Sequence, residues 1–139
     1  MKTKRILLDT HVWLWHISGE ETLSHRIINL IDTAASRHEL FISAISVWEI
    51  AMLANKRKIV LNTSCLSWIN ASLSLPGITL IPLSPEIAVE SCQLPDNFHG
   101  DPTDRILAAT AKIENLTLIT RDKKLLVYGA KKHISTLSA

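Results

Sequence analysis

The sequence predicts an α/β fold: a three-layer α/β/α sandwich around a central, mostly parallel sheet of four to five strands. Two observations lead to this fold class. Short apolar runs alternate with helix-like segments along the chain, and each run carries apolar residues at successive positions. A strand of that kind is buried on both faces, as the strands of parallel sheets are. The order of the strands does not follow from this pattern.

Length and composition fit one globular domain over residues 1–139. The chain can bury a sizeable core, because 47% of its 139 residues are hydrophobic. A net charge of +2 permits a nucleic-acid partner without demanding one. No stretch approaches the roughly 18 apolar residues of a membrane span. We expect a soluble cytoplasmic protein in which Cys65 and Cys92 are buried free thiols rather than a disulfide.

The first half of the chain alternates apolar runs with longer amphipathic segments. The run 6–8 stops at Asp9, which separates it from a helix-like segment that Gly19 ends. Later apolar residues recur at helical spacing, with polar residues opposite. The expected elements are a strand at 6–8, helices at 10–16 and 24–36, a strand at 40–42 and a helix at 43–53, closed by the basic residues 56–58.

Proline and glycine divide the second half. Pro76-Gly77 ends one helix, and Ser84 with Pro85 supplies a cap and a first helical residue for the next. The segment 94–100 is rich in turn residues. The expected elements are helices at 64–75, 85–92 and 102–114, a short helix around 125–127, and strands at 78–81, 116–119 and 134–137.

Two acids, Asp9 and Asp122, each directly follow a predicted buried strand and precede a helix. A carboxylate caps a helix well, so capping alone is one interpretation of either residue. The carboxyl ends of parallel strands nevertheless meet at one edge of the sheet, where the functional groups of open α/β folds gather. Two strands that end in the same way therefore favour a shared site.

Glu49 lies on a strongly apolar helix, on the same face as Ile45 and Met52. A buried carboxylate is costly unless it is paired, protonated or bound to a metal. The alternative is a capping box from Ser46 to Glu49, which requires the helix to begin at Ser46. The apolar residues before Ser46 favour an earlier start and a functional Glu49.

The segment Asp101-Pro102-Thr103-Asp104 begins the next helix. By local rules Asp101 is its N-cap and Pro102 its first residue, which fully accounts for Asp101. Asp104 stands one turn before Leu107 and Ala108, so it faces the interior of a mostly apolar helix. Because residues three apart share a face, Asp101 can reach the same site as Asp104.

Four acids, Asp9, Glu49, Asp104 and Asp122, thus come from four segments and can converge at one sheet edge. Clustered carboxylates repel each other unless a cation neutralises them. Oxygen ligands without a set of Cys or His suit a hard cation, Mg²⁺ or Mn²⁺. Such an ion keeps bound waters, as hydrolysis of a phosphodiester requires.

At this point the sequence resembles the PIN-domain family, in particular the VapC-type toxin ribonucleases of toxin–antitoxin systems. The matching motifs, in the family's order, are Leu7-Leu8-Asp9-Thr10-His11-Val12, Ser46-Val47-Trp48-Glu49-Ile50, Asp101-Pro102-Thr103-Asp104-Arg105-Ile106-Leu107-Ala108-Ala109-Thr110-Ala111 and Leu118-Ile119-Thr120-Arg121-Asp122. The resemblance implies a PIN-like fold and metal-dependent RNA cleavage, with the four acids at the metal site. It implies supporting positions beside them for Asp101, Thr10 and Thr120.

The resemblance also implies products with 5′-phosphate and 3′-hydroxyl ends, and partners. The expected partners are an RNA substrate, a second copy in a homodimer, and a cognate antitoxin whose tail covers the site. The resulting hetero-oligomer would bind operator DNA.

RNA needs cations and stacking surfaces near an acidic centre. Arg105, Arg121 and Lys123 are candidates for RNA contact, although each also fits a solvated helix end. His11 and His99 flank acidic segments, and a structural role is the usual one for a lone histidine. Trp13, Trp15 and Trp48 suit base stacking, a dimer interface or the core.

Other functions stay open at this level. A DNA-directed or structure-specific nuclease needs the same metal site, and a catalytically silent binding module keeps the same fold. A phospho-acceptor domain wants a second acid near the first strand, so Glu49 and Asp104 on helices argue against it. The RNA target and the preferred ion do not follow from the sequence.

Overall fold

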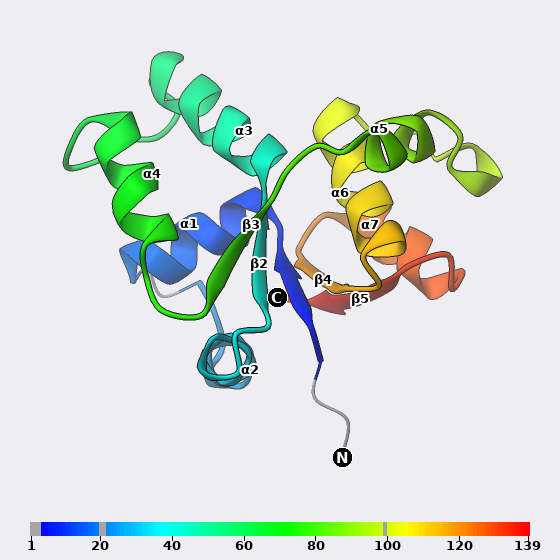
Figure 1. The fold of residues 1–139 in the computed structure, drawn as a ribbon, viewed down its shortest axis with the longest axis horizontal. Helices are drawn as coiled ribbons and strands as arrows, with labels where there is room; N and C mark the ends of the chain where they lie inside the picture. Colours follow the sequence, from blue (N-terminus) through cyan, green and yellow to red (C-terminus); the bar gives the residue numbers. More distant parts are fainter. Residues whose placement is uncertain (1–3, 20–21, 99) are drawn as a thin grey trace.

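Five parallel strands form one sheet in the computed structural model, which describes residues 4–19, 22–98 and 100–139 (Figure 1). The strands are β1 (Ile6–Leu8), β2 (Leu40–Ser43), β3 (Ile78–Ile81), β4 (Thr117–Thr120) and β5 (Ser135–Ser138). Their order is β3-β2-β1-β4-β5, and all neighbouring pairs are parallel. The predicted fold class is confirmed, and the strand order is now defined.

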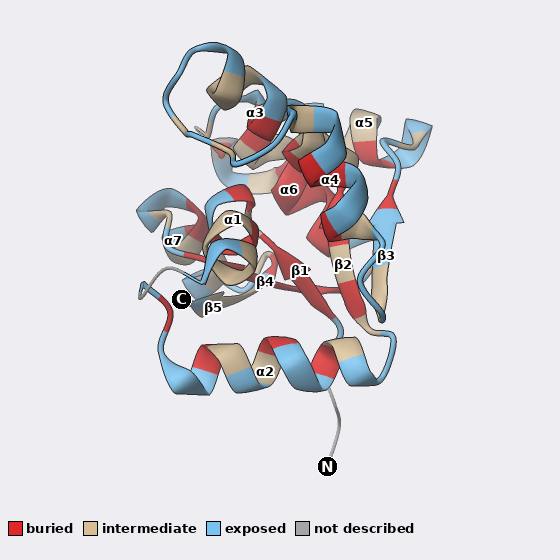
Figure 2. Cartoon of the chain, turned by 90° about the vertical axis from the view of Figure 1, so that its left-hand side faces the viewer, coloured by how far each residue is buried: buried red, intermediate tan, exposed pale blue. Residues whose placement is uncertain are grey.

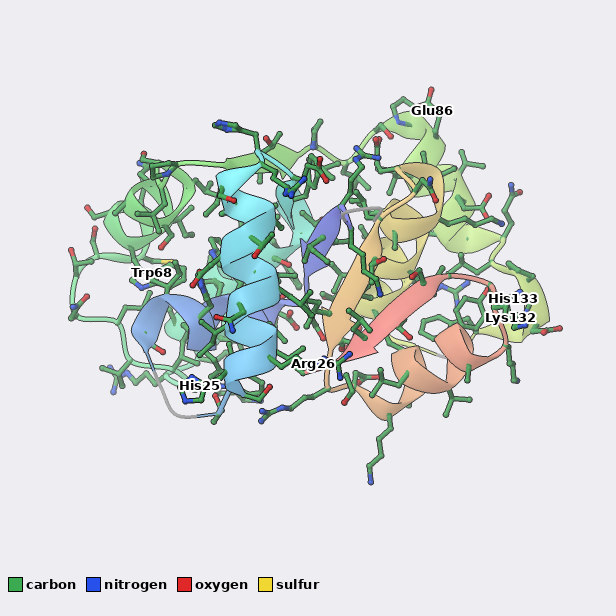
Figure 3. All side chains as sticks on the ribbon, turned by 90° about the horizontal axis from the view of Figure 1, so that it is seen from below. His25, Arg26, Trp68, Glu86, Lys132 and His133 are labelled. Carbon is green, nitrogen blue, oxygen red and sulfur yellow. The ribbon has the colours of Figure 1, made fainter. Side chains whose placement is uncertain are left out.

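Helices cover both faces of this sheet. In the described residues they are α1 (Thr10–Ser18), α2 (His25–Ser36), α3 (Ala44–Asn55), α4 (Cys65–Leu73), α5 (Pro85–Cys92), α6 (Pro102–Ile113) and α7 (Lys123–Ala130), with a 3₁₀ turn at Pro95–Asn97. Helices α1, α2 and α4 lie on one side of the sheet in Figure 1, and α5, α6 and α7 lie on the other. Seen from below, Trp68 of α4 and His133 accordingly lie on opposite sides of the molecule (Figure 3).

The central strand β1 shows why the apolar runs are unbroken. Ile6 and Leu8 pack into a core with α1, α2 and α4, whereas Leu7 packs into a second core with α5, α6 and α7. All three side chains are at most 1% exposed. Successive residues point to opposite faces of a sheet, so a strand covered on both faces needs apolar residues at every position. Figure 2 shows this burial along β1.

A serine or aspartate side chain caps the amino end of each described α-helix. The caps are Asp9, Ser24, Ser43, Ser64, Ser84, Asp101 and Asp122. Ser43 accepts a hydrogen bond from the Ile45 backbone N–H, and α3 therefore begins at Ala44. The alternative capping box from Ser46 to Glu49 is wrong, because Ser46 lies inside the helix. Helix α1 also runs two residues beyond the predicted end, up to Gly19, whose φ is 70°.

The prediction for the cysteines is half right. Cys65 and Cys92 are both free, but Cys65 is half-buried and Cys92 is exposed. Ile87 and Ser91 form the buried face of α5, and Cys92 is turned about 100° away from Ser91 on a 3.6-residue helix. The apolar residues around Cys92 in the sequence therefore led to a wrong prediction that it is buried. None of the described helices combines the length and the apolar character needed to cross a bilayer.

Candidate active site

The structure brings Asp9, Glu49, Asp104 and Asp122 together around one cleft of about 320 Å³, and Asp101 lines it too. Asp9 follows β1 and Asp122 follows β4, which are neighbours in the sheet. From β1 the chain first builds β2 and β3 on one side, and it then returns to build β4 and β5 on the other. The cleft thus lies where the strand order reverses, the usual ligand site of open α/β sheets.

Two helices complete the cleft from above the sheet edge. Glu49 comes from α3, which starts directly after β2, and Asp104 comes from the first turn of α6. Helix α3 packs against both α1 and α6, and α3 and α6 rise beyond the carboxyl ends of the strands in Figure 1. Segments far apart in sequence therefore meet here because of the parallel topology.

Three of the carboxylates also cap helices. One oxygen of Asp9 accepts a hydrogen bond from the Thr10 N–H at 2.7 Å, and Asp101 accepts one from the Asp104 N–H at 2.9 Å. Asp122 accepts from the Leu125 N–H at 3.0 Å. The predicted capping is therefore confirmed, and these capping residues also meet at one cleft, whereas their role at a metal site stays a prediction. Capping fixes each carboxylate by one oxygen while the residue lines the cleft.

Buried hydroxyl groups beside the cleft form hydrogen bonds that help to position the acids. The buried Thr120 donates to the second oxygen of Asp9 at 2.6 Å and accepts from the Asp122 N–H at 3.0 Å. The buried Thr10 donates to the hydroxyl of Ser46 at 2.9 Å. Thr10 and Thr120 thus lie beside the acids, as expected. Ser46 was missed as a supporting residue, and its only signal was a hydroxyl on the buried side of an apolar helix.

The acids destabilise each other's charged forms. Burial, followed by the negative charges of Asp101, Asp122, Asp9 and Glu49, raises the pKa of Asp104 to about 7. Burial also raises the pKa of Asp9, against hydrogen bonds from Thr120 and Thr10, and it raises the pKa of Glu49, against the Thr10 hydroxyl. The cleft therefore has an excess of negative charge.

Ion pairs within the described part of the chain do not neutralise this excess of negative charge. Across residues 4–19, 22–98 and 100–139 the pairs are His16 with Asp32, Lys112 with Glu90 and His133 with Asp96, none of which involves a cleft acid. In these ranges, no three His, Cys, Asp or Glu side chains are arranged closely enough to hold a metal ion as they stand. Mg²⁺ commonly binds through only one or two carboxylates and keeps several waters. An oxygen-only donor set with unbalanced charge therefore fits such an ion.

The predicted RNA-contact residues have different surroundings. Arg121 and His11 line the cleft. The Arg105 guanidinium instead donates to the backbone carbonyls of Ser91, at 2.9 Å, and of Phe98. Lys123 lines a separate hollow on α7. His99 lies outside the described residues.

The predicted aromatic residues separate into core and surface. Trp13 is fully buried and its ring centroid lies 5.2 Å from that of Trp68, so Trp13 is a core residue. Trp48 is 54% exposed on α3. Trp15 is half-buried and forms part of the cleft wall.

The sequence profile of the PIN domain matches residues 6–131, and the chain belongs to this family. Ribonuclease VapC22 of Mycobacterium tuberculosis is 34% identical over 120 residues, which cover 86% of this chain and 88% of that protein. The family expected from the motifs is thus confirmed.

Solved structures agree with the fold. The DNA-bound VapBC of Salmonella typhimurium superposes with a TM-score of 0.71 at 16% identity, covering 97% of this chain and 98% of that chain. A toxin–antitoxin complex of Klebsiella pneumoniae superposes with a TM-score of 0.58 at 26% identity, covering 86% of this chain and 88% of that chain.

Proposed function

We propose that the protein is an endoribonuclease that hydrolyses RNA phosphodiester bonds with Mg²⁺ or Mn²⁺ and acts as the toxin of a toxin–antitoxin pair. The observation that carries this proposal is the cleft itself, where carboxylates from four distant segments lie together and none of them is ion-paired with a cation among the described residues. The ribonuclease name of the relative VapC22 supports RNA as the substrate.

Each acid has a defined role in this proposal. Asp9 is the central metal-holding residue, because it directly follows the central strand and is fixed by Thr10 and Thr120. Asp104 and Glu49 hold the ion directly or through its waters, and Asp122 supports them. When bound, the ion supplies an activated water and offsets the charge that develops on the phosphate. The residues of the chain supply the orientation of the acids around the ion.

The test is cleavage of end-labelled RNA by purified, antitoxin-free protein in Mg²⁺, Mn²⁺ or EDTA, with single-stranded DNA in parallel. We expect discrete RNA cuts that require metal and leave 5′-phosphate and 3′-hydroxyl ends. Cutting of DNA alone would replace the proposal with a DNA-directed nuclease of the same fold. Intact substrates in every lane would point to a silent binding module.

A groove beside the cleft is a candidate binding site for the antitoxin. A groove of about 1070 Å³ runs between α1, the loop 58–63 and α4, and its lining includes His11 and Trp15, which also line the acidic cleft. The groove exposes Val60 (94%) and Leu75 (45%). We propose that an apolar segment of the antitoxin occupies it and that the adjoining chain reaches the acids. VapBC and other toxin–antitoxin complexes among the structural relatives support such a partner.

Higher assembly follows from the same proposal. Several structural relatives are complexes bound to DNA, so we propose operator binding for the hetero-oligomer. The homodimer and the cytoplasmic location stay predictions. Light scattering of the free protein and of the toxin–antitoxin complex checks the first of them.

A further inference from the structure

Arg121 is the one lysine or arginine that lines the acidic cleft among the described residues. It is exposed, and the cleft also contains five carboxylates, including that of its neighbour Asp122. An arginine close to carboxylates ordinarily forms a bidentate ion pair with one of them, because its planar guanidinium donates two parallel hydrogen bonds to the two oxygens. Arg121 forms no ion pair with an Asp or Glu side chain within 4 Å in the described part of the chain.

Two contacts hold Arg121 away from the acids. Its guanidinium carbon lies 4.7 Å from the centroid of the Trp15 ring, and its Nε donates to the main-chain oxygen of Ala139, the last of the 139 residues, at 3.0 Å. Ala139 is itself fixed, because its N–H donates to the Thr120 carbonyl at 3.0 Å. Trp15 packs against the core on the α1 side of the sheet. These two contacts therefore fix the position of the guanidinium at the cleft wall.

An incoming nucleic-acid strand needs such a group. The strand carries negative phosphates, and the cleft acids repel all of them except where a metal ion neutralises the site. An arginine that forms a bidentate ion pair with a carboxylate is less available to bind a phosphate. The contacts of Arg121 use the face of the guanidinium and its Nε, so both Nη groups stay available to a phosphate, and the ordered side chain loses less entropy on binding.

We propose that Arg121 binds a phosphate of the nucleic-acid strand next to the scissile phosphate, and that Trp15 is the positioning residue that holds the Arg121 guanidinium for this contact. The inference rests on the proposed nuclease function and adds the group that places the substrate. Arg105 does not have this role, because it does not line the cleft and the Ser91 and Phe98 carbonyls engage both its Nε and an Nη group.

Binding is measured separately from cleavage. The parent is Asp104→Asn, which keeps the strand intact, and the probe is a fluorescein-labelled single-stranded RNA titrated by anisotropy over a range of KCl concentrations. One phosphate contact contributes about 0.7 to the slope of log K against log salt for single strands. We expect Arg121→Gln to lower the slope by that amount and to weaken binding about tenfold at low salt.

The Trp15 variants distinguish positioning from charge. Trp15→Leu keeps an apolar side chain but removes the ring, and we expect it to reproduce most of the Arg121→Gln change although no charge is lost. Trp15→Phe restores a ring and most of the affinity. Trp48→Leu is the matched control, because Trp48 is an exposed tryptophan outside the cleft. Circular dichroism confirms that each variant is folded.

Cleavage kinetics then separate this inference from the proposed function. In the wild-type background we expect Arg121→Gln and Trp15→Leu to raise KM with little change in kcat, as loss of a ground-state contact does. An unchanged salt slope in Arg121→Gln, or Trp15→Leu binding as tightly as the parent, overturns the inference even if wild-type protein cuts RNA. Absence of cleavage by wild-type protein sinks the proposed function, and the binding slopes still decide the role of Arg121.

Discussion

The hydroxyl of Thr120 donates a 2.6 Å hydrogen bond to Oδ2 of Asp9 and so connects two residues that are 111 positions apart in the chain. Thr120 is the last residue of β4, and Asp9 follows the last residue of β1. The same Thr120 oxygen accepts the N–H of Asp122. One buried hydroxyl therefore sets the relative positions of two candidate metal-site acids.

Replacing Thr120 by valine removes both hydrogen bonds at nearly constant volume. We expect Thr120→Val to lower the free energy of unfolding by about 1–3 kcal/mol, since a buried acceptor loses its donor. Cleavage should fall by about 10- to 100-fold, as for other groups that orient metal ligands. Thr120→Ser keeps the hydroxyl and is the control. Urea unfolding measures the stability of both variants, and an RNA cleavage assay measures their activity. Equal activities of Thr120→Val and Thr120→Ser would contradict a positioning role for the Thr120 hydroxyl.

Gly100 is required by close packing beside Asp104. A Cβ added at Gly100 would overlap with the Phe98 ring and lie 2.8 Å from the Asp104 Cβ. We expect Gly100→Ala to displace Asp104, to cost about 1–3 kcal/mol of stability and to reduce cleavage at least about tenfold.

Gly19→Ala is the matched control for Gly100→Ala. A Cβ at Gly19 meets nothing within 4 Å, but its φ of 70° is strained for alanine, which costs about 1 kcal/mol. Thermal unfolding should show a loss for both variants, whereas the cleavage rate should fall only for Gly100→Ala. Full activity in both would mean that Asp104 tolerates displacement.

The raised pKa of Asp104 predicts a pH-dependent stability of the metal-free protein. Between the ordinary value of 3.8 and about 7 the folded state binds more protons than the unfolded state, so the free energy of unfolding falls as pH rises. Asp104→Asn removes this loss. Its advantage over wild type should be about 1–2 kcal/mol larger near pH 8 than near pH 4.5, after allowance for partial exposure.

Urea unfolding in EDTA at the two pH values measures that advantage. Addition of Mn²⁺ should reduce it, because the ion stabilises the charged wild-type cleft. An advantage of the same size at both pH values would contradict the charge repulsion inferred for the cleft.

The groove beside the cleft predicts a separation of binding from catalysis. Val60→Asp puts a charge on the groove wall, and we expect it to weaken antitoxin binding about tenfold or more while leaving RNA cleavage unchanged. Leu66→Asp is the matched control, because Leu66 is 68% exposed on α4 but does not line the groove. Titration calorimetry with the cognate antitoxin measures both. Equal affinities would place the antitoxin elsewhere.

Much of the architecture was predictable because local rules and packing agree. The unbroken apolar run of β1 reflects burial on both faces, and Ser84 caps α5 as its sequence predicts. The four acids were identifiable because each stands at the end of a strand or among apolar helix residues. Their assembly around one cleft follows from the parallel direction of β1 and β4.

Other features depend on which neighbours the fold supplies. The sequence does not contain the strand order, so the neighbours of Arg121 were not predictable and its contact with Trp15 was missed. Arg105 looked equivalent to Arg121, but carbonyls of α5 and of residue 98 engage it. Trp48 is exposed and Trp13 is buried although both lie in apolar helices. Long-range packing decides such cases.

The central claim is that the carboxylates of the cleft form one metal-dependent site for phosphodiester hydrolysis, and Asp9→Asn tests it most directly. The measurement is the single-turnover cleavage rate of a labelled RNA at saturating Mn²⁺, with Asp32→Asn as the control, since the Asp32 side chain is 62% exposed on α2 outside the cleft. We predict a loss of more than about 100-fold for Asp9→Asn, with wild-type rate in Asp32→Asn and the Asp9→Asn protein folded. A folded Asp9→Asn protein that cuts RNA at the wild-type rate would contradict the account.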